Sequence, residues 1–128
     1  RTNLGIQFSG FPNLWAVMGP HNPALFCNIT RCAENNVEWI VDCISYMRKN
    51  GYQTMQTTVE AEDDWTRACY DSAEGLLIND MQDSWFFGST NPDNVRGHFM
   101  LYAGGVPKYR EIFNNVKTNG YPGFTLIK

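Results

Sequence analysis

Apolar residues recur at helical spacing in three segments of the chain, and each segment is bounded by residues that start or stop helices. The first segment begins near Thr30 and ends at Gly51, directly after a last turn that carries two cations. Its apolar stripe consists of Val37, Ile40, Val41, Ile44 and Met47. We therefore predict a long helix over about residues 30–50.

Two further helices are predicted from the same spacing. The second opens at Thr57, because Thr57 and Glu60 are spaced as a capping box, and it fades near Ile78. Its predicted buried face consists of Trp65, Ala68, Cys69, Ser72 and Leu76. The third begins near Pro107 after the turn Gly104-Gly105 and stops at Asn119-Gly120. Its predicted apolar face consists of Tyr109, Ile112, Phe113 and Val116.

Short strands are predicted at residues 4–8, 14–18, 98–103 and 124–127, and Gly, Pro and Asn in residues 9–13 predict a turn between the first two. Residues 52–58 are predicted to be an extended link. The two N-terminal strands have no evident partner except each other, so we expect part of a sheet to be missing. The predicted fold class is α/β, mainly helices with three or four short strands, in one segment, 1–128.

The stretch 10–28 is the most informative part of the chain. Its apolar run, residues 14–18, ends abruptly at Gly19-Pro20, and residues 21–28 then follow without a helical or strand period. In open α/β sheets, ligands bind where the chain leaves the carboxyl end of a strand. Two prolines also stiffen the loop. We interpret it as a wall that faces a ligand.

Composition changes this picture in two ways. Only 18% of the residues are charged and 14% are aromatic, which favours a piece of a larger protein over a free-standing domain. The net charge is −3 and no basic stripe is present, so binding to nucleic acid is not expected. We also expect no signal peptide, no membrane span and a cytoplasmic location.

The cysteines and carboxylates give no strong catalytic or metal signature. Cys43 and Cys69 fall on apolar faces of predicted helices, where we expect them to be buried. No C-x-x-C pair occurs and only two histidines are present, so we expect no metal site. Disulfides are left open. Cys27 and His21 share one loop without an evident third group, which argues against a nucleophile and base.

Two other candidates have ordinary structural interpretations. The acidic run of residues 60–64 is interpreted as the first turn of a helix, where carboxylates face the positive end of the helix dipole. Gly104-Gly105 lacks both phosphate-loop signatures and is interpreted as a tight turn. Trp85 remains of interest, because a Trp at the mouth of a polar loop can pack with one face and donate its indole N–H to a ligand.

Seven motifs, taken together and in order, resemble one enzyme family. They read GFPNLWAVMGP, NPALFCN, VEWIVDCISYMRKNGY, TVEAEDDWT, DSWFFG, LYAGGVPKYR and NGYPGF. This set is similar to the C-terminal portion of Baeyer–Villiger monooxygenases, the class B flavoprotein monooxygenases of the cyclohexanone and phenylacetone monooxygenase type.

The resemblance implies a piece of a fold with two dinucleotide-binding domains, a bound FAD, and NADPH that reduces it. It implies insertion of one oxygen atom from O2 into a ketone, which gives an ester or lactone. Cofactor contacts are implied for Gly19, Pro20, Asn28 and Trp85, the last on a cofactor-capping loop over about residues 79–97. A substrate pocket is implied for Leu25, Phe26 and Cys27.

The chain also departs from the family pattern. After Trp85 the family reads Gly-Ala-Asn-(Ile/Val)-Pro-Gly-Lys, whereas this chain has Gly-Ser-Thr-Asn-Pro-Asp-Asn in residues 88–94, without the basic residue. The glycine fingerprints and the catalytic residues are expected upstream, in a missing N-terminal portion that would be the partner of this chain. We therefore expect the chain alone to be inactive and to hold no FAD. The alternative is a non-catalytic remnant or interaction module.

Overall fold

The computed structural model describes residues 1–80, 85–87 and 98–128. Within them the regular elements are three α-helices, α1 (Ile29–Asn50), α2 (Val59–Ala73) and α3 (Val106–Thr118), and two strands, β1 (Thr54–Thr57) and β2 (Phe124–Ile127). Three short 3-10 turns complete the list: η1 (Ala24–Phe26), η2 (Leu77–Asp80) and η3 (Trp85–Phe87).

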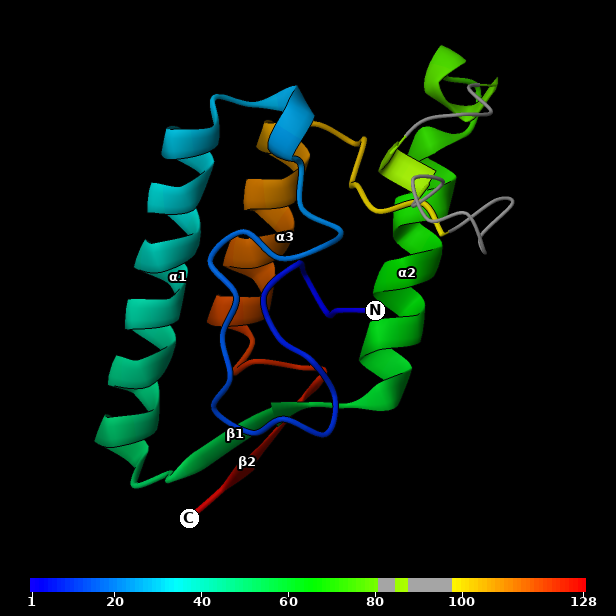
Figure 1. Cartoon of the computed structure of the whole chain (residues 1–128). Coiled ribbons are helices and arrows are strands. Elements are labelled where there is room, and N and C mark those ends of the chain that lie inside the picture. Colours follow the sequence, from blue (N-terminus) through cyan, green and yellow to red (C-terminus); the bar gives the residue numbers. More distant parts are fainter. Residues whose placement is uncertain (81–84, 88–97) are drawn as a thin grey trace.

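The helices flank a layer of irregular N-terminal chain. In Figure 1, α1 and α2 lie on opposite sides, α3 lies behind and between them, and the N-terminal segment passes through the space that they enclose. The strands form an antiparallel pair at one end of the helices, with Thr54 opposite Ile127 and Thr57 opposite Phe124. The segment of residues 10–28 runs from beside the strand pair to the start of α1, with residues 10–14 exposed and residues 19 and 21–23 buried.

Helix α1 begins and ends close to the predicted residues. Asn28 caps its N-terminus, and its side chain accepts a hydrogen bond from the Arg31 amide. Gly51 ends it in the left-handed conformation, with φ at 73°. Ile40 and Met47 are buried as predicted, but Val37 and Val41 are 43% and 54% exposed. The predicted stripe was too wide, because α1 contacts the core through a face centred on Trp39 and Cys43.

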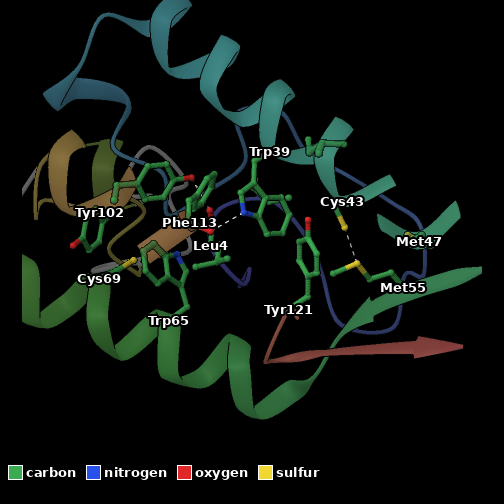
Figure 2. Close-up of a cluster of buried hydrophobic side chains, with 13 residues drawn as sticks. Leu4, Trp39, Cys43, Met47, Met55, Trp65, Cys69, Tyr102, Phe113 and Tyr121 are labelled. Atoms are coloured by element: carbon green, nitrogen blue, oxygen red, sulfur yellow. Dashed lines mark hydrogen bonds between the residues drawn. The ribbon is translucent and has the colours of Figure 1, made fainter. Parts of the chain in front are cut away.

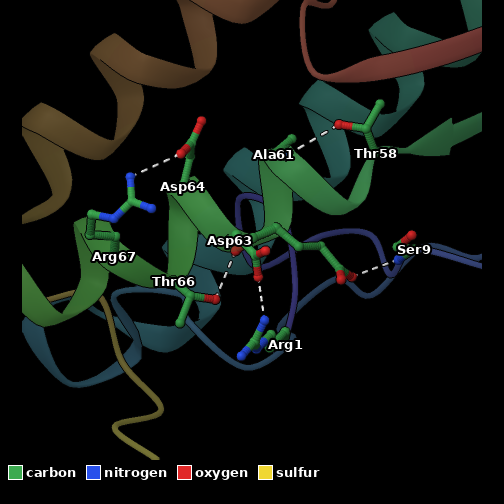
Figure 3. Close-up of polar contacts among 9 residues, drawn as sticks. Arg1, Ser9, Thr58, Ala61, Asp63, Asp64, Thr66 and Arg67 are labelled. Atoms are coloured by element: carbon green, nitrogen blue, oxygen red, sulfur yellow. Dashed lines mark hydrogen bonds and ion pairs between the residues drawn. The ribbon is translucent and has the colours of Figure 1, made fainter.

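Helix α2 begins one residue later than predicted. Thr58, not Thr57, is the N-cap, and its hydroxyl accepts a hydrogen bond from the Ala61 amide at 3.2 Å (Figure 3). Thr57 is instead the last residue of β1, and its hydroxyl donates to the Gly123 carbonyl. The helix also ends earlier, at Ala73, so Leu76 lies outside it and is 39% exposed.

The predicted strands at residues 4–8, 14–18 and 98–103 form only isolated bridges. Asn3 pairs with Gln7, Gln7 pairs with Trp15, and Asn22 pairs with Leu101. Leu4 has a φ of 57°, which is incompatible with an extended strand. Regular pairing occurs instead between the predicted link, which contains β1, and the terminal strand β2. The α/β class, with helices dominant, is confirmed.

One aromatic and sulfur-rich core joins these elements (Figure 2). Trp39 lies at its centre, 3% exposed, with its ring near the rings of Phe113 and Tyr121, and its indole N–H donates to the Phe113 carbonyl at 3.0 Å. Cys43 and Cys69 are fully buried, as predicted. Burial raises the pKa of the Cys43 thiol to about 12, and raises that of Cys69 too, so both remain protonated.

Candidate functional site

Gly19 and Pro20 attach the predicted ligand wall to the N-terminal loop. The Gly19 amide donates to the Gly5 carbonyl at 3.1 Å, and the Thr2 hydroxyl donates to the Pro20 carbonyl at 2.8 Å. A Cβ atom on Gly19 would lie 2.5 Å from that Gly5 oxygen. Only glycine allows the two backbone segments to approach this closely. The described contacts of Gly19 are therefore packing contacts.

His21 and Asn22 attach the same segment to the chain that follows η3 and to α2. The His21 amide donates to the Met100 carbonyl at 2.7 Å, and the Asn22 carbonyl accepts from the Tyr102 amide at 3.1 Å. The Trp65 indole N–H donates to the His21 carbonyl at 3.1 Å. Three segments that are distant in the sequence are thus held together at one buried corner.

The His21 side chain is buried within this corner and is 4% exposed. Its Nε2 lies 3.0 Å from the Phe99 carbonyl, so the hydrogen bond requires the tautomer with the proton on Nε2. Its Nδ1 has no partner among the described residues. Desolvation lowers the pKa of His21, so the neutral imidazole is favoured. The residue stabilises the corner as a neutral donor.

The predicted pocket residues Leu25 and Phe26 lie on η1 and turn outward. Their exposed fractions are 47% and 40%, and the Phe26 amide closes the turn onto the Pro23 carbonyl at 2.8 Å. Neighbouring apolar side chains that are both exposed are suited to covering an apolar or flat ligand. Asn28 follows with its side-chain oxygen engaged in capping α1, at 2.6 Å from the Thr30 hydroxyl.

Cys27 forms a disulfide with Cys32 across the start of α1. Both residues line a cavity of about 210 Å³ between α1 and α3, together with Asn28, Arg31 and Arg110. The predicted site residues Cys27 and Asn28 therefore share a cavity. Leu25 and Phe26 do not line it, and Gly19 and Pro20 lie in the preceding segment.

Trp85 belongs to η3, but its side chain and most of the predicted capping loop, residues 79–97, lie outside the described residues. Phe87 of the same turn is buried and lies 5.3 Å, centroid to centroid, from Phe99. This contact ties the turn to the buried corner. The proposed contact of Trp85 with a nicotinamide cofactor stays a prediction.

The acidic run lies at the N-terminus of α2, as predicted (Figure 3). A Glu62 carboxylate oxygen accepts from the Ser9 amide at 2.6 Å, and Asp63 pairs with Arg1. Both carboxylates attach the N-terminal loop to α2, and Glu62 lies in the first turn, where it faces the positive end of the helix dipole. Among the residues that the structure describes, no cluster of metal-ligating side chains occurs and no helix is long and apolar enough to cross a membrane.

Sequence reasoning missed two features of this region. The disulfide was left open, although Cys27 and Cys32 flank the Asn28 cap at the two positions that meet at the start of a helix. The buried position of His21 carried no periodic signal, because His21 follows Pro20 in a segment without a period and has a φ of 68°.

Comparisons with known proteins identify what this arrangement is related to. No protein-family model matches the chain. It is 36% identical to cyclohexanone 1,2-monooxygenase of Acinetobacter sp. over 123 residues, which are 96% of the chain and 22% of the relative. A cyclohexanone monooxygenase from Rhodococcus sp. Phi1, solved with NADP+, matches with a TM-score of 0.90 and 35% identity over 99% of the chain and 23% of that structure.

A third relative is a solved structure named OTEMO, in complex with FAD and NADP. It matches with a TM-score of 0.86 and 35% identity, over 98% of the chain and 22% of that structure. These proteins belong to the flavin-dependent monooxygenases. More particularly, the chain is related to Baeyer–Villiger monooxygenases, so the resemblance predicted from the motifs is confirmed. The chain spans less than a quarter of the length of these relatives.

Proposed function

We propose that this chain is part of an FAD- and NADPH-dependent monooxygenase that inserts one oxygen atom from O2 into a ketone to give an ester or lactone. The observation that carries the proposal is the match over 99% of the chain, at 35% identity, to a cyclohexanone monooxygenase solved with NADP+. No observation favours the alternative of a non-catalytic remnant. A cytoplasmic location is part of the same proposal.

Within that enzyme, the chain would supply a wall beside the flavin and the substrate. Leu25 and Phe26 present exposed apolar surface on a turn that the buried corner and the cap of α1 hold on both sides. Flat and apolar surfaces suit an aromatic ring system or a cyclic ketone. Gly19, Pro20, Cys27 and Asn28 would form the frame of this wall, and Trp85 would cover the nicotinamide cofactor.

The described residues fit one part of FAD better than another. The sequence contains no G-x-G-x-x-G fingerprint for a diphosphate. The N-terminus of α1 is capped by the Asn28 side chain, and the first turn of α2 carries Glu60 and Glu62, which repel phosphate. The chain therefore fits the ring side of the cofactor and needs a partner portion to hold the diphosphate.

The surface of the chain supports such a partner. Large apolar side chains are exposed on α1, at Ile29, Val37 and Val41, and in the segment before it, at Leu14 and Val17. Exposed apolar surface of this kind typically packs against another protein surface. We propose that the N-terminal portion of the same enzyme covers it.

Reconstitution tests the proposal. The chain is co-expressed with the remaining portion of a related cyclohexanone monooxygenase, and the purified complex is examined for bound flavin and for ketone-dependent oxidation of NADPH. We expect that both the retention of flavin and the ketone-dependent oxidation of NADPH require the chain. The variant with Leu25→Asp and Phe26→Asp should lower ketone turnover, whereas Leu77→Asp, at an 85% exposed position on η2, should leave it unchanged. A complex that forms but retains no flavin would contradict the proposal.

A further inference from the structure

We propose that Cys27 and Cys32 form a thiol–disulfide exchange site for a low-molecular-weight peptide thiol that carries both carboxylate and ammonium groups. The site consists of the disulfide at the start of α1 and the cavity of about 210 Å³ that Cys27 and Cys32 help to line. The proposal does not depend on the proposed monooxygenase activity, because it concerns only the chemistry of this disulfide.

The disulfide occupies positions that the helix start itself brings together. Cys27 precedes the cap Asn28, and Cys32 is the fourth residue of α1. Side chains at these two positions pack against each other in many helices, as a staple over the cap. The two Cα atoms are 6.5 Å apart, within the range of ordinary disulfides. Because the helix start sets this distance, the pair can cycle between bonded and reduced states without refolding of α1.

The two sulfurs differ in access to an attacking thiol. Cys27 is half-buried, in the turn between η1 and α1, whereas Cys32 is 3% exposed within the helix. An external thiolate can therefore reach the Cys27 sulfur from the cavity more easily than it can reach that of Cys32. The remaining cysteines, Cys43 and Cys69, are fully buried and serve as internal controls.

The helix N-terminus favours Cys32 as the leaving group. Cys32 is the fourth residue of α1, its amide donates to the Asn28 carbonyl at 3.0 Å, and the first turn contains no acidic residue. Amide dipoles at a helix start stabilise a thiolate, and a more stable thiolate leaves a disulfide faster. The neighbouring Arg31 adds positive charge at the same cavity, although it also pairs with Glu34 at 3.1 Å.

The exchange is balanced with the external thiol as the only co-reactant. Its thiolate attacks the Cys27 sulfur, the new S–S bond forms, and the Cys27–Cys32 bond breaks with the electron pair leaving on Cys32, which then takes a proton from water. A second thiol completes the reduction and leaves as the symmetrical disulfide. The cavity lining carries both charges, Arg31 and Arg110 together with Glu34 and Glu38, so it suits a small zwitterionic peptide thiol such as glutathione, which has carboxylates and an ammonium group.

Mass spectrometry with glutathione disulfide as the probe tests the proposal on the whole chain. In the Cys32→Ser variant the Cys27 thiolate should attack glutathione disulfide and form a mixed disulfide, with one glutathione leaving as the thiol; in the Cys27→Ser variant the same reaction at Cys32 should be roughly tenfold slower because that thiol is buried. Replacing glutathione disulfide with the uncharged disulfide of mercaptoethanol should slow the reaction at Cys27. Equal rates of mixed-disulfide formation in the two variants would overturn the proposed difference in access between the Cys27 and Cys32 sulfurs.

A measurement on the unmodified chain keeps the test independent of the variants' folding. After purification in air, the chain is unfolded in iodoacetamide and digested, and the peptides are mapped. We expect alkylation at Cys43 and Cys69 and a disulfide between Cys27 and Cys32. Millimolar glutathione should open that disulfide while Cys43 and Cys69 in the folded chain stay unmodified. Alkylation of all four cysteines in the air-purified chain would overturn the proposal.

Discussion

Replacement of Gly19 by alanine tests whether the wall is held by backbone packing. The added Cβ would lie 2.5 Å from the Gly5 carbonyl oxygen and 3.0 Å from the Ala16 Cβ. Neither Gly5 nor Gly19 can move aside freely, because the Gly19 amide donates to that same oxygen at 3.1 Å. Overpacking of this kind costs about 2 kcal/mol, and in a chain of this size it lowers the midpoint of thermal unfolding by roughly 8 °C.

The assay is urea unfolding of the chain without any cofactor, followed by tryptophan fluorescence. Gly10→Ala is the matched control, since it makes the same chemical change in the same segment, where no atom lies within 4 Å of the added Cβ. Gly10 has a φ of 86°, so the control should cost about 1 kcal/mol from backbone strain alone. If Gly19→Ala unfolds at the same urea concentration as the unchanged chain, Gly19 does not act through packing.

Three further predictions concern the same segment. Burial lowers the pKa of His21 below 6.5, so the unfolded chain binds a proton at this residue more readily than the folded chain does. The free energy of unfolding should therefore fall as the pH drops below 6.5. His21→Asn should remove that loss, whereas His98→Gln should not. The measurement is a set of unfolding curves recorded from pH 5 to 8. The same pH dependence in both variants would contradict the role of His21. Asn28→Ala should lose about 1 kcal/mol of unfolding free energy through the cap of α1, whereas Asn28→Asp should lose almost none, as measured by urea unfolding. Reduction of Cys27–Cys32 should lower the unfolding free energy by about 2 kcal/mol through loop entropy, and the Cys27→Ser, Cys32→Ser double variant should not respond to the reductant.

The helices were predictable because each one carries its own start and stop signals. Gly51 was predicted as the end of α1 and Asn119-Gly120 as the end of α3, whereas the start of α1 was placed near Thr30 and Asn28 was not identified as its cap. The boundary of α2 was misplaced because Thr57 and Thr58 are adjacent, and only the tertiary contact of Thr57 with Gly123 decides which one caps the helix.

The candidate site was less accessible to sequence reasoning. The break at Gly19-Pro20 singled out residues 10–28, and Leu25 and Phe26 are exposed there, but a wall that faces a ligand stays a prediction. The buried corner was not visible, since it depends on hydrogen bonds from His21 to Met100 and Phe99, almost eighty positions away in the chain. Contacts of such separation leave no periodic pattern in a single sequence.

The central claim, that this chain completes a Baeyer–Villiger-type monooxygenase, is tested most directly by following the oxygen atom. The reconstituted complex is supplied with NADPH, cyclohexanone and isotopically labelled O2, and the product is analysed by mass spectrometry. We predict a lactone that contains one labelled oxygen atom and forms only when the chain is present. Consumption of NADPH by a flavin-loaded complex without any labelled lactone or ester, across a panel of cyclic and open-chain ketones, would contradict the account.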